Sequence, residues 1–234
     1  MCLRREGATY ISLTEKHNDS YDFSVPITDR TNQVPTQYFA ACLAPLHGVE
    51  KKWLLLAEFI EHHKLQGVSY FYIYKYELDQ YSRLLLDDYV RYGEAEVIVL
   101  RDHSKRAKKQ WHQPQLQECL TRARGHSKWV AMIDLDERLT STKCNRTISD
   151  YLRERVFHSD TSKTAKKPSQ KRNLRAAAKV VVANIHSAEI FFDGYERYYM
   201  KPDEAVIRHY RNIHIDNWAK KFLPHWKELG EDSH

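Results

Sequence analysis

Strand-like and helix-like segments alternate along this chain from residue 37 onward, and this alternation limits the fold more than any other feature. β-forming apolar segments predict strands at 37–44, 68–76, 95–100 and 129–133. Apolar residues at helical spacing, closed by Gly67 and Gly93 in the first two cases, predict helices at 49–65, 80–91 and 113–124. Strands that alternate with helices predict an α/β fold with a mostly parallel, Rossmann-like sheet and helices on both faces.

Composition and charge set the outer limits. A chain of 234 residues suits one large domain or one domain with an appendage, and 42% hydrophobic residues is enough for a core. The net charge of +6 favours phosphate-rich partners, but much of it lies in the stretch 163–179, which has many Lys and Arg and no acid. We interpret this stretch as a solvated loop rather than a nucleic-acid-binding arm, because it has no aromatic residues to stack on bases.

The sequence offers few signs of membrane or disulfide structure. No apolar run reaches the roughly 18 residues of a membrane span, and the start lacks the apolar core of a signal peptide. Two tripeptides, at 18–20 and 145–147, would accept glycans in the secretory pathway. Four cysteines permit three full pairings, none of which their spacing selects; they are Cys2, Cys42, Cys119 and Cys144.

Two carboxylates follow the last predicted strand at once. Asp134 and Asp136 lie at its carboxyl end, where ligands bind in an α/β sheet. If the chain stays extended there, both side chains point to the same side. Mg²⁺ or Mn²⁺ takes one or two protein carboxylates and completes its shell with water and phosphate oxygens. The pattern therefore predicts a divalent-cation site, and the alternative is a solvated acidic turn.

Glycine-rich nucleotide-binding signatures are missing from the sequence. The turn after the first strand, at 44–49, has no Gly-x-Gly-x-x-Gly, and no phosphate-binding loop motif occurs elsewhere. A cation on the two aspartates would supply another way to offset phosphate charge. This is the logic of a nucleotide-sugar transferase, in which the metal stabilises the leaving nucleoside diphosphate.

Separated blocks of the sequence resemble glycosyltransferase family 92, formerly a domain of unknown function abundant in nematodes, over about residues 37–220. The blocks occur in the family's order, and they lie at 44–48, 53, 58–63, 81–90, 115–120, 126–130, 134–139 and 202–211. The resemblance implies a GT-A-type fold, a divalent metal with Mn²⁺ expected, and inverting transfer of galactose from UDP-galactose to a fucose on N-glycan cores.

The resemblance also implies an organisation and a location. Family members are type II membrane proteins of the secretory pathway, so we expect Golgi membrane association, although this chain shows no anchor and is expected to be an N-terminally incomplete form. Residues 1–35 read as an irregular lead-in or stem remnant, residues 36–220 as the family domain, and residues 221–234 as a C-terminal tail.

Site residues follow from matching positions. Asp134 and Asp136 match the family's Asp-x-Asp, with Asp136 expected to bind the metal directly and Asp134 to contact ribose or a metal-bound water. His209 matches the histidine of His-Tyr-Arg and is expected to complete the metal site. Arg211 could pair with the diphosphate or form a surface salt bridge. His47 follows the first strand, near the expected uridine.

The catalytic base and two structural details stay open at this level. An inverting enzyme needs a carboxylate to take the acceptor's proton, and we prefer Asp193 to Glu189, although each could be an ordinary loop acid. Glu137 and Arg138 could form an ion pair that orients the aspartates, or simply a capped turn. The alternate tyrosines at 70–76 read as a packed strand face rather than a platform for sugars.

Two other functions compete with a working transferase acting on a UDP-sugar donor and a glycan or glycoprotein acceptor. One is an inactive relative that still binds glycan or nucleotide. The other is a basic protein that binds nucleic acid through 163–179. We favour the transferase and expect no nucleic-acid partner.

Overall fold

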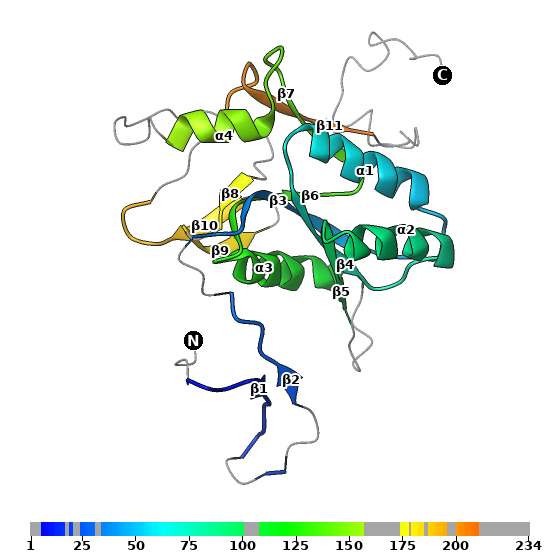
Figure 1. Cartoon of the computed structure of the whole chain (residues 1–234), viewed down its shortest axis with the longest axis vertical. Helices are drawn as coiled ribbons and strands as arrows, with labels where there is room; N and C mark the ends of the chain where they lie inside the picture. Colours follow the sequence, from blue (N-terminus) through cyan, green and yellow to red (C-terminus); the bar gives the residue numbers. More distant parts are fainter. Residues whose placement is uncertain are drawn as a thin grey trace.

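A five-stranded sheet forms the centre of the molecule (Figure 1). The computed structural model describes residues 6–16, 19–20, 24–30, 34–100, 108–156, 174–177, 179–184, 187–195 and 200–210. The sheet has the spatial order β5-β4-β3-β6-β8. Its strands are β3 (Gln37–Leu46), β4 (Tyr70–Lys75), β5 (Ala95–Val99), β6 (Ser127–Ile133) and β8 (Leu174–Ala176).

The sheet is mostly parallel and is covered on both faces. The first four strands pair in parallel, and β8 pairs with β6 antiparallel. The helices are α1 (Trp53–Leu65), α2 (Gln80–Arg91), α3 (His112–Ala123) and α4 (Ile148–Val156), and a short 3₁₀ helix, Lys108–Trp111, precedes α3. Buried residues of α1, α2 and α4 form one core, and those of α3 form another on the opposite face. The predicted Rossmann-like α/β fold is confirmed.

Local signals explain where these elements begin. The Asp79 side chain accepts a hydrogen bond from the Ser82 N–H and so caps α2 at the predicted residue. The prediction placed the end of β3 before Pro45, but the strand continues to Leu46. Its pairing with β4 shifts register between Leu43 and Leu46, which lets a proline, with no N–H to donate, sit in a central strand.

The aromatic face of β4 is core, as predicted. Tyr72 and Tyr74 are fully buried against α3. The Tyr72 hydroxyl lies 2.6 Å from His126 Nδ1 and 2.7 Å from Ser127 Oγ, and the Tyr74 hydroxyl donates to Glu118. Burial raises the pKa of both phenols well above its ordinary value, so both keep their protons.

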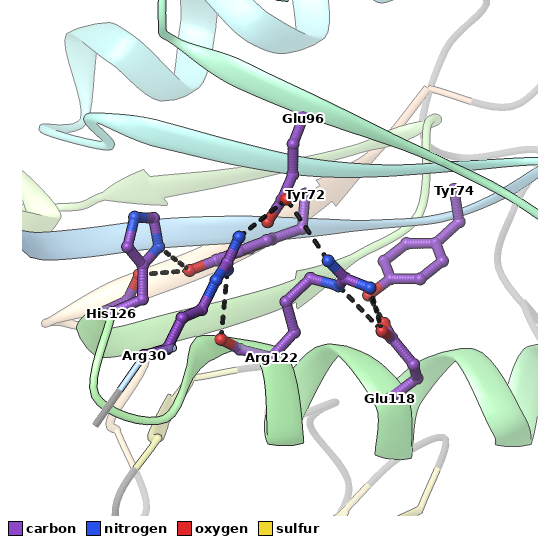
Figure 2. Close-up of polar contacts among 8 residues, drawn as sticks. Arg30, Tyr72, Tyr74, Glu96, Glu118, Arg122 and His126 are labelled. Carbon is purple, nitrogen blue, oxygen red and sulfur yellow. Dashed lines mark hydrogen bonds and ion pairs between the residues drawn. The ribbon is translucent and has the colours of Figure 1, made fainter. Parts of the chain in front are cut away.

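Arg30 links the N-terminal lead-in to the sheet by an ion pair with Glu96 on β5, as Figure 2 shows. Its Nη2 lies 2.8 Å from Glu96 Oε2, and its Nη1 donates to the Arg122 carbonyl at 3.2 Å. Arg122 reaches the same Glu96 carboxylate at 3.4 Å and pairs with Glu118 at 2.5 Å. The lead-in also contains one antiparallel pair, β1 (Tyr10–Ile11) with β2 (Val25–Pro26).

Within the described residues, the second half of the chain adds, besides β8, four further strands that the sequence did not predict. They form two antiparallel pairs, β7 (Glu137–Ser141) with β11 (Ala205–His209) and β9 (Val180–Asn184) with β10 (Ser187–Phe191). The basic stretch 163–179 is not simply a solvated loop, because its residues 174–176 form β8 against β6. Its residues 163–173 lie outside the described residues.

A disulfide bond joins strand β3 of the sheet to helix α3 on its face. Cys42 on β3 pairs with Cys119 on α3, and both are buried. Cys144 is exposed and outside any disulfide, and Cys2 lies outside the described residues. No helix in the described part of the chain is both long and apolar enough to span a membrane.

The disulfide predicts a measurable loss of stability on removal. Changing Cys42 and Cys119 together to Ala should lower the free energy of unfolding by about 2–4 kcal/mol, because a link across 77 residues restricts the unfolded chain. Urea unfolding of the oxidised protein measures this. Cys144→Ala is the matched control and should change nothing, and equal stability of all three proteins would contradict the prediction.

Candidate functional site

The acidic turn, residues 134–137, lies where β6 ends at the carboxyl edge of the parallel strands. Asp134 and Asp136 are partly exposed, whereas Glu137 is buried. The Glu137 N–H donates to the Asp134 carbonyl at 3.0 Å, so the chain turns here and does not stay extended. The sequence argument that both side chains point to the same side required an extended chain, which is not what the structure shows. The turn, and not the alternation along a strand, therefore sets the directions of the two carboxylates.

The backbone of the acidic turn is held at each of its first three residues. The Asp134 N–H donates to Glu137 Oε2 at 3.0 Å. Arg138 Nη1 donates to the Leu135 carbonyl at 2.7 Å, and the Tyr210 N–H donates to the Asp136 carbonyl at 2.7 Å. These bonds come from the turn itself, from β7 and from the end of β11. The two aspartates therefore sit on a preorganised backbone.

Arg138 supports the acidic turn through hydrogen bonds to its backbone carbonyls. Its side chain is almost fully buried and also donates to the Glu137 carbonyl at 3.0 Å. The guanidinium lies 5.7 Å from the Phe59 ring centre and 5.6 Å from that of Tyr210, and 3.6 Å from the Glu58 carboxylate. Of the two readings offered for Glu137 and Arg138, the structure shows the capped turn.

His209 lies beside the acidic turn although it is distant in sequence. Strands β7 and β11 pair so that His209 stands opposite Glu137. His209 Nε2 is 2.7 Å from Glu137 Oε1, and about a third of the histidine side chain is exposed. The structure thus brings together the Asp-x-Asp segment and the predicted histidine, and the role of His209 as a metal ligand stays a prediction.

His112 is a site residue that the sequence analysis missed. It is the first residue of α3, and its Nε2 lies 3.9 Å from Asp134 Oδ1. Both side chains are partly exposed. The predicted helix began one residue later, and a single histidine at a helix start gave no other signal. Only the packing of α3 against the sheet places it near Asp134.

Two adjacent histidines of α1 hold the strand that follows the acidic turn. His63 is fully buried, with its Nδ1 2.7 Å from the Phe59 carbonyl and its Nε2 accepting the Leu139 N–H at 3.2 Å. His62 Nε2 lies 3.0 Å from the Leu139 carbonyl. Burial lowers the pKa of His63 to about 3, so its ring is neutral and Nδ1 carries the proton.

The remaining predicted residues lie farther out or outside the described residues. His47 follows β3 at the sheet's carboxyl edge, with its ring 6.0 Å from that of Tyr76. Glu189 on β10 and Asp193 just after it are exposed. Their hairpin packs against α3, where Gln113 donates to the Ala183 carbonyl, and lies apart from β7 and β11 in Figure 1. Arg211 lies outside the described residues.

The donor chemistry of the acidic turn suits a hard divalent cation. Within the described ranges, no three His, Cys, Asp or Glu side chains form a ready metal-binding group. Mg²⁺ and Mn²⁺ do not require one, because one or two carboxylates suffice when water and phosphate oxygens complete the shell. Asp134 and Asp136 match that requirement.

The α/β domain that carries the acidic turn matches a known protein family. The model of glycosyltransferase family 92 matches residues 37–176, from β3 through β8. The match spans more than half of the chain and includes the acidic turn, so the chain belongs to glycosyltransferase family 92. The predicted family, a family of glycosyltransferases, is confirmed.

No curated protein matches the chain. Among solved structures, the crystal structure of HddC from Yersinia pseudotuberculosis is similar at 12% identity with a TM-score of 0.32, covering 53% of this chain and 55% of that chain. The similar region is therefore about half the length of that chain.

The buried His63 predicts acid sensitivity. Its pKa is about 3 in the folded protein and near 6.5 when unfolded, so the unfolded state binds more protons between these values. The free energy of unfolding should therefore fall as pH drops from about 6.5 toward 3, by up to about 1.4 kcal/mol per pH unit from this group.

His63→Gln keeps a donor and an acceptor but cannot titrate, and it is the matched comparison. His62 and His126, whose pKa values burial also lowers, remain in the variant, so the difference between the two proteins isolates His63. Urea unfolding of both proteins at pH 7 and pH 5 measures how the free energy of unfolding changes with pH. The same pH slope in both proteins would show that His63 does not contribute.

Proposed function

We propose that this chain is a metal-dependent, inverting glycosyltransferase that moves a hexose, with galactose expected, from a UDP-sugar to a glycan acceptor. The observation that carries the proposal is the acidic turn, whose backbone is fixed at Asp134, Leu135 and Asp136, at the carboxyl edge of a family 92 domain. Ligands bind at this edge in open α/β sheets.

Asp136 is the proposed direct ligand of Mn²⁺ or another divalent cation, and Asp134 contacts the donor ribose or a metal-bound water. When bound, the cation offsets the charge that develops on the leaving diphosphate. His209 stands beside the acidic turn and completes the cation site. His112, near Asp134, is positioned to contact the same donor.

His47 and Arg211 complete the proposed donor contacts. His47 lies at the same sheet edge, after β3, and faces the uridine in this proposal. Arg211 follows His209 and Tyr210 in sequence and pairs with the diphosphate, for which a guanidinium offers two parallel N–H donors.

The acceptor side is proposed to lie on the β9–β10 hairpin. A carboxylate there, Asp193 in preference to Glu189, takes the proton of the acceptor hydroxyl as its oxygen forms the new bond to the sugar's anomeric carbon. The bond from that carbon to the diphosphate breaks, and the electron pair leaves with the diphosphate. The exposure of both acids is compatible with contact to a large glycan.

We further propose a location in the secretory pathway, with membrane association by family. The buried Cys42–Cys119 disulfide supports an oxidising compartment. Asn145 supports it as well, because this acceptor residue of the 145–147 tripeptide is exposed in the turn before α4, with a φ of 58°.

Removing the proposed metal ligand should abolish transfer. Asp136→Asn should lower kcat/KM for UDP-galactose by about 100-fold or more, and EDTA should do the same to the unchanged protein, since both remove the cation that stabilises the leaving group. Asp87→Asn, an exposed carboxylate of α2, is the matched control and should retain activity.

Transfer and hydrolysis assays with Mn²⁺ or EDTA separate the candidate functions. Metal-independent turnover, or full activity of Asp136→Asn, would overturn the proposal. UDP-sugar binding without turnover would instead identify an inactive relative. A nucleic-acid-binding protein would show binding that falls steeply with salt and survives Asp136→Ala.

Secretion should place a glycan on Asn145. When the chain is expressed behind a signal peptide in eukaryotic cells, its electrophoretic mobility should increase on treatment with an N-glycosidase, and Asn145→Gln should lose this glycan because the acceptor amide is gone. Thr147→Ser keeps the tripeptide and should retain it. Identical mobility of Asn145→Gln and the unchanged protein would exclude modification at this residue.

A further inference from the structure

One buried carboxylate connects the two parts of the proposed cation site. Glu137 is only 1% exposed. Its Oε1 lies 2.7 Å from His209 Nε2, and its Oε2 accepts the Asp134 N–H at 3.0 Å. The same side chain therefore contacts the residue that ends β11 and the first residue of the acidic turn.

The chemistry of this contact assigns the proton on His209. A carboxylate only accepts hydrogen bonds, so the Nε2 that faces Glu137 carries hydrogen. In the neutral ring the lone pair is then on Nδ1. Metal-binding histidines commonly use this arrangement, donating one ring N–H to a carboxylate while the other nitrogen binds the metal.

Backbone pairing reinforces the side-chain contact. His209 pairs with Glu137 in the β7–β11 ladder, and the next residue, Tyr210, donates its N–H to the Asp136 carbonyl at 2.7 Å. The position of the imidazole relative to the acidic turn is thus set by two backbone contacts and one buried side chain. Both ends of this connection are residues of the proposed site.

We propose that Glu137 is a positioning residue, which holds the His209 proton on Nε2 and fixes the imidazole against the acidic turn so that Nδ1 is the nitrogen offered to a cation. The inference deepens the proposed function and rests on it only in assigning that cation. The position of the proton is a property of the chain itself.

Glu204 provides a matched control within the same protein. It is also buried, at 5% exposure, and its Oε2 accepts the Lys201 N–H at 2.8 Å. The spacing of three residues is the same as that between Asp134 and Glu137. Glu204→Gln therefore perturbs a buried turn cap of the same kind, outside the proposed site.

Glu137→Gln tests the assignment directly. The Asp134 N–H and His209 Nε2–H both donate to Glu137, whereas a carboxamide has one accepting oxygen and one donating NH₂. If the oxygen keeps the Asp134 N–H, the NH₂ faces His209 Nε2, which can accept only after its proton moves to Nδ1. The imidazole ¹⁵N NMR spectrum at alkaline pH should show Nε2–H in the unchanged protein and Nδ1–H in the variant. His209→Ala identifies the signals.

Mn²⁺ affinity is the second readout, measured by electron paramagnetic resonance on the full chain without any sugar nucleotide. Glu137→Gln should weaken binding by about 10- to 100-fold. His209→Ala should weaken it comparably, and the double variant should be no weaker than His209→Ala, because Glu137 acts through His209. Glu204→Gln should keep the original Mn²⁺ affinity and the original ¹⁵N spectrum. Its thermal unfolding should be similar to that of Glu137→Gln, because both variants alter a buried turn cap.

Each outcome decides between the inference and its alternatives. Nε2–H retained in Glu137→Gln, additive losses in the double variant, or an equal loss in Glu204→Gln would overturn the positioning role. If the unchanged protein binds no Mn²⁺, the metal-dependent proposal fails, and the NMR comparison alone decides whether Glu137 sets the His209 proton. If Mn²⁺ binds and responds as expected but no sugar is transferred, the inference stands and the transferase proposal fails.

Discussion

The site depends on how the chain satisfies the backbone of one tight turn at the edge of the sheet. Once β6 ends at Ile133, the polar groups of the following residues lose their strand partners, and partners from β7 and from Tyr210, just after β11, replace them. Buried backbone groups without partners are costly, so these bonds hold the turn in one shape. In the proposed cation site, the short reach of the two aspartate side chains makes that shape decisive, because a carboxylate on a moving turn cannot hold a cation in place.

One family block, residues 58–63, makes structural contacts around this turn. The histidines of the 58–63 block hold β7 through Leu139, and Glu58 and Phe59 flank the buried Arg138. His63 can do this only as a neutral ring, which links the shape of the acidic turn to pH. A motif shared by a family can therefore mark the support of a site as well as the site.

Sequence reasoning succeeded where local patterns and tertiary packing agree. The helix at 80–91 and the strands around it were predicted nearly to the residue, since an aspartate cap and apolar spacing act within a few positions. It failed in the second half, where β7, β9, β10 and β11 are short strands whose partners lie in other parts of the chain or just across a turn. It also passed over His112, whose only distinction is its place beside Asp134.

By itself, the sequence determined the α/β class, the family and the two aspartates at the end of β6, because strand and helix periodicities and the order of the blocks are written in neighbouring residues. Only the tertiary structure decided that Glu137 is buried between Asp134 and His209, that Cys42 pairs with Cys119, and that the chain turns at Asp134. These contacts join residues far apart along the chain, or depend on what packs above them, and no local pattern encodes such distances.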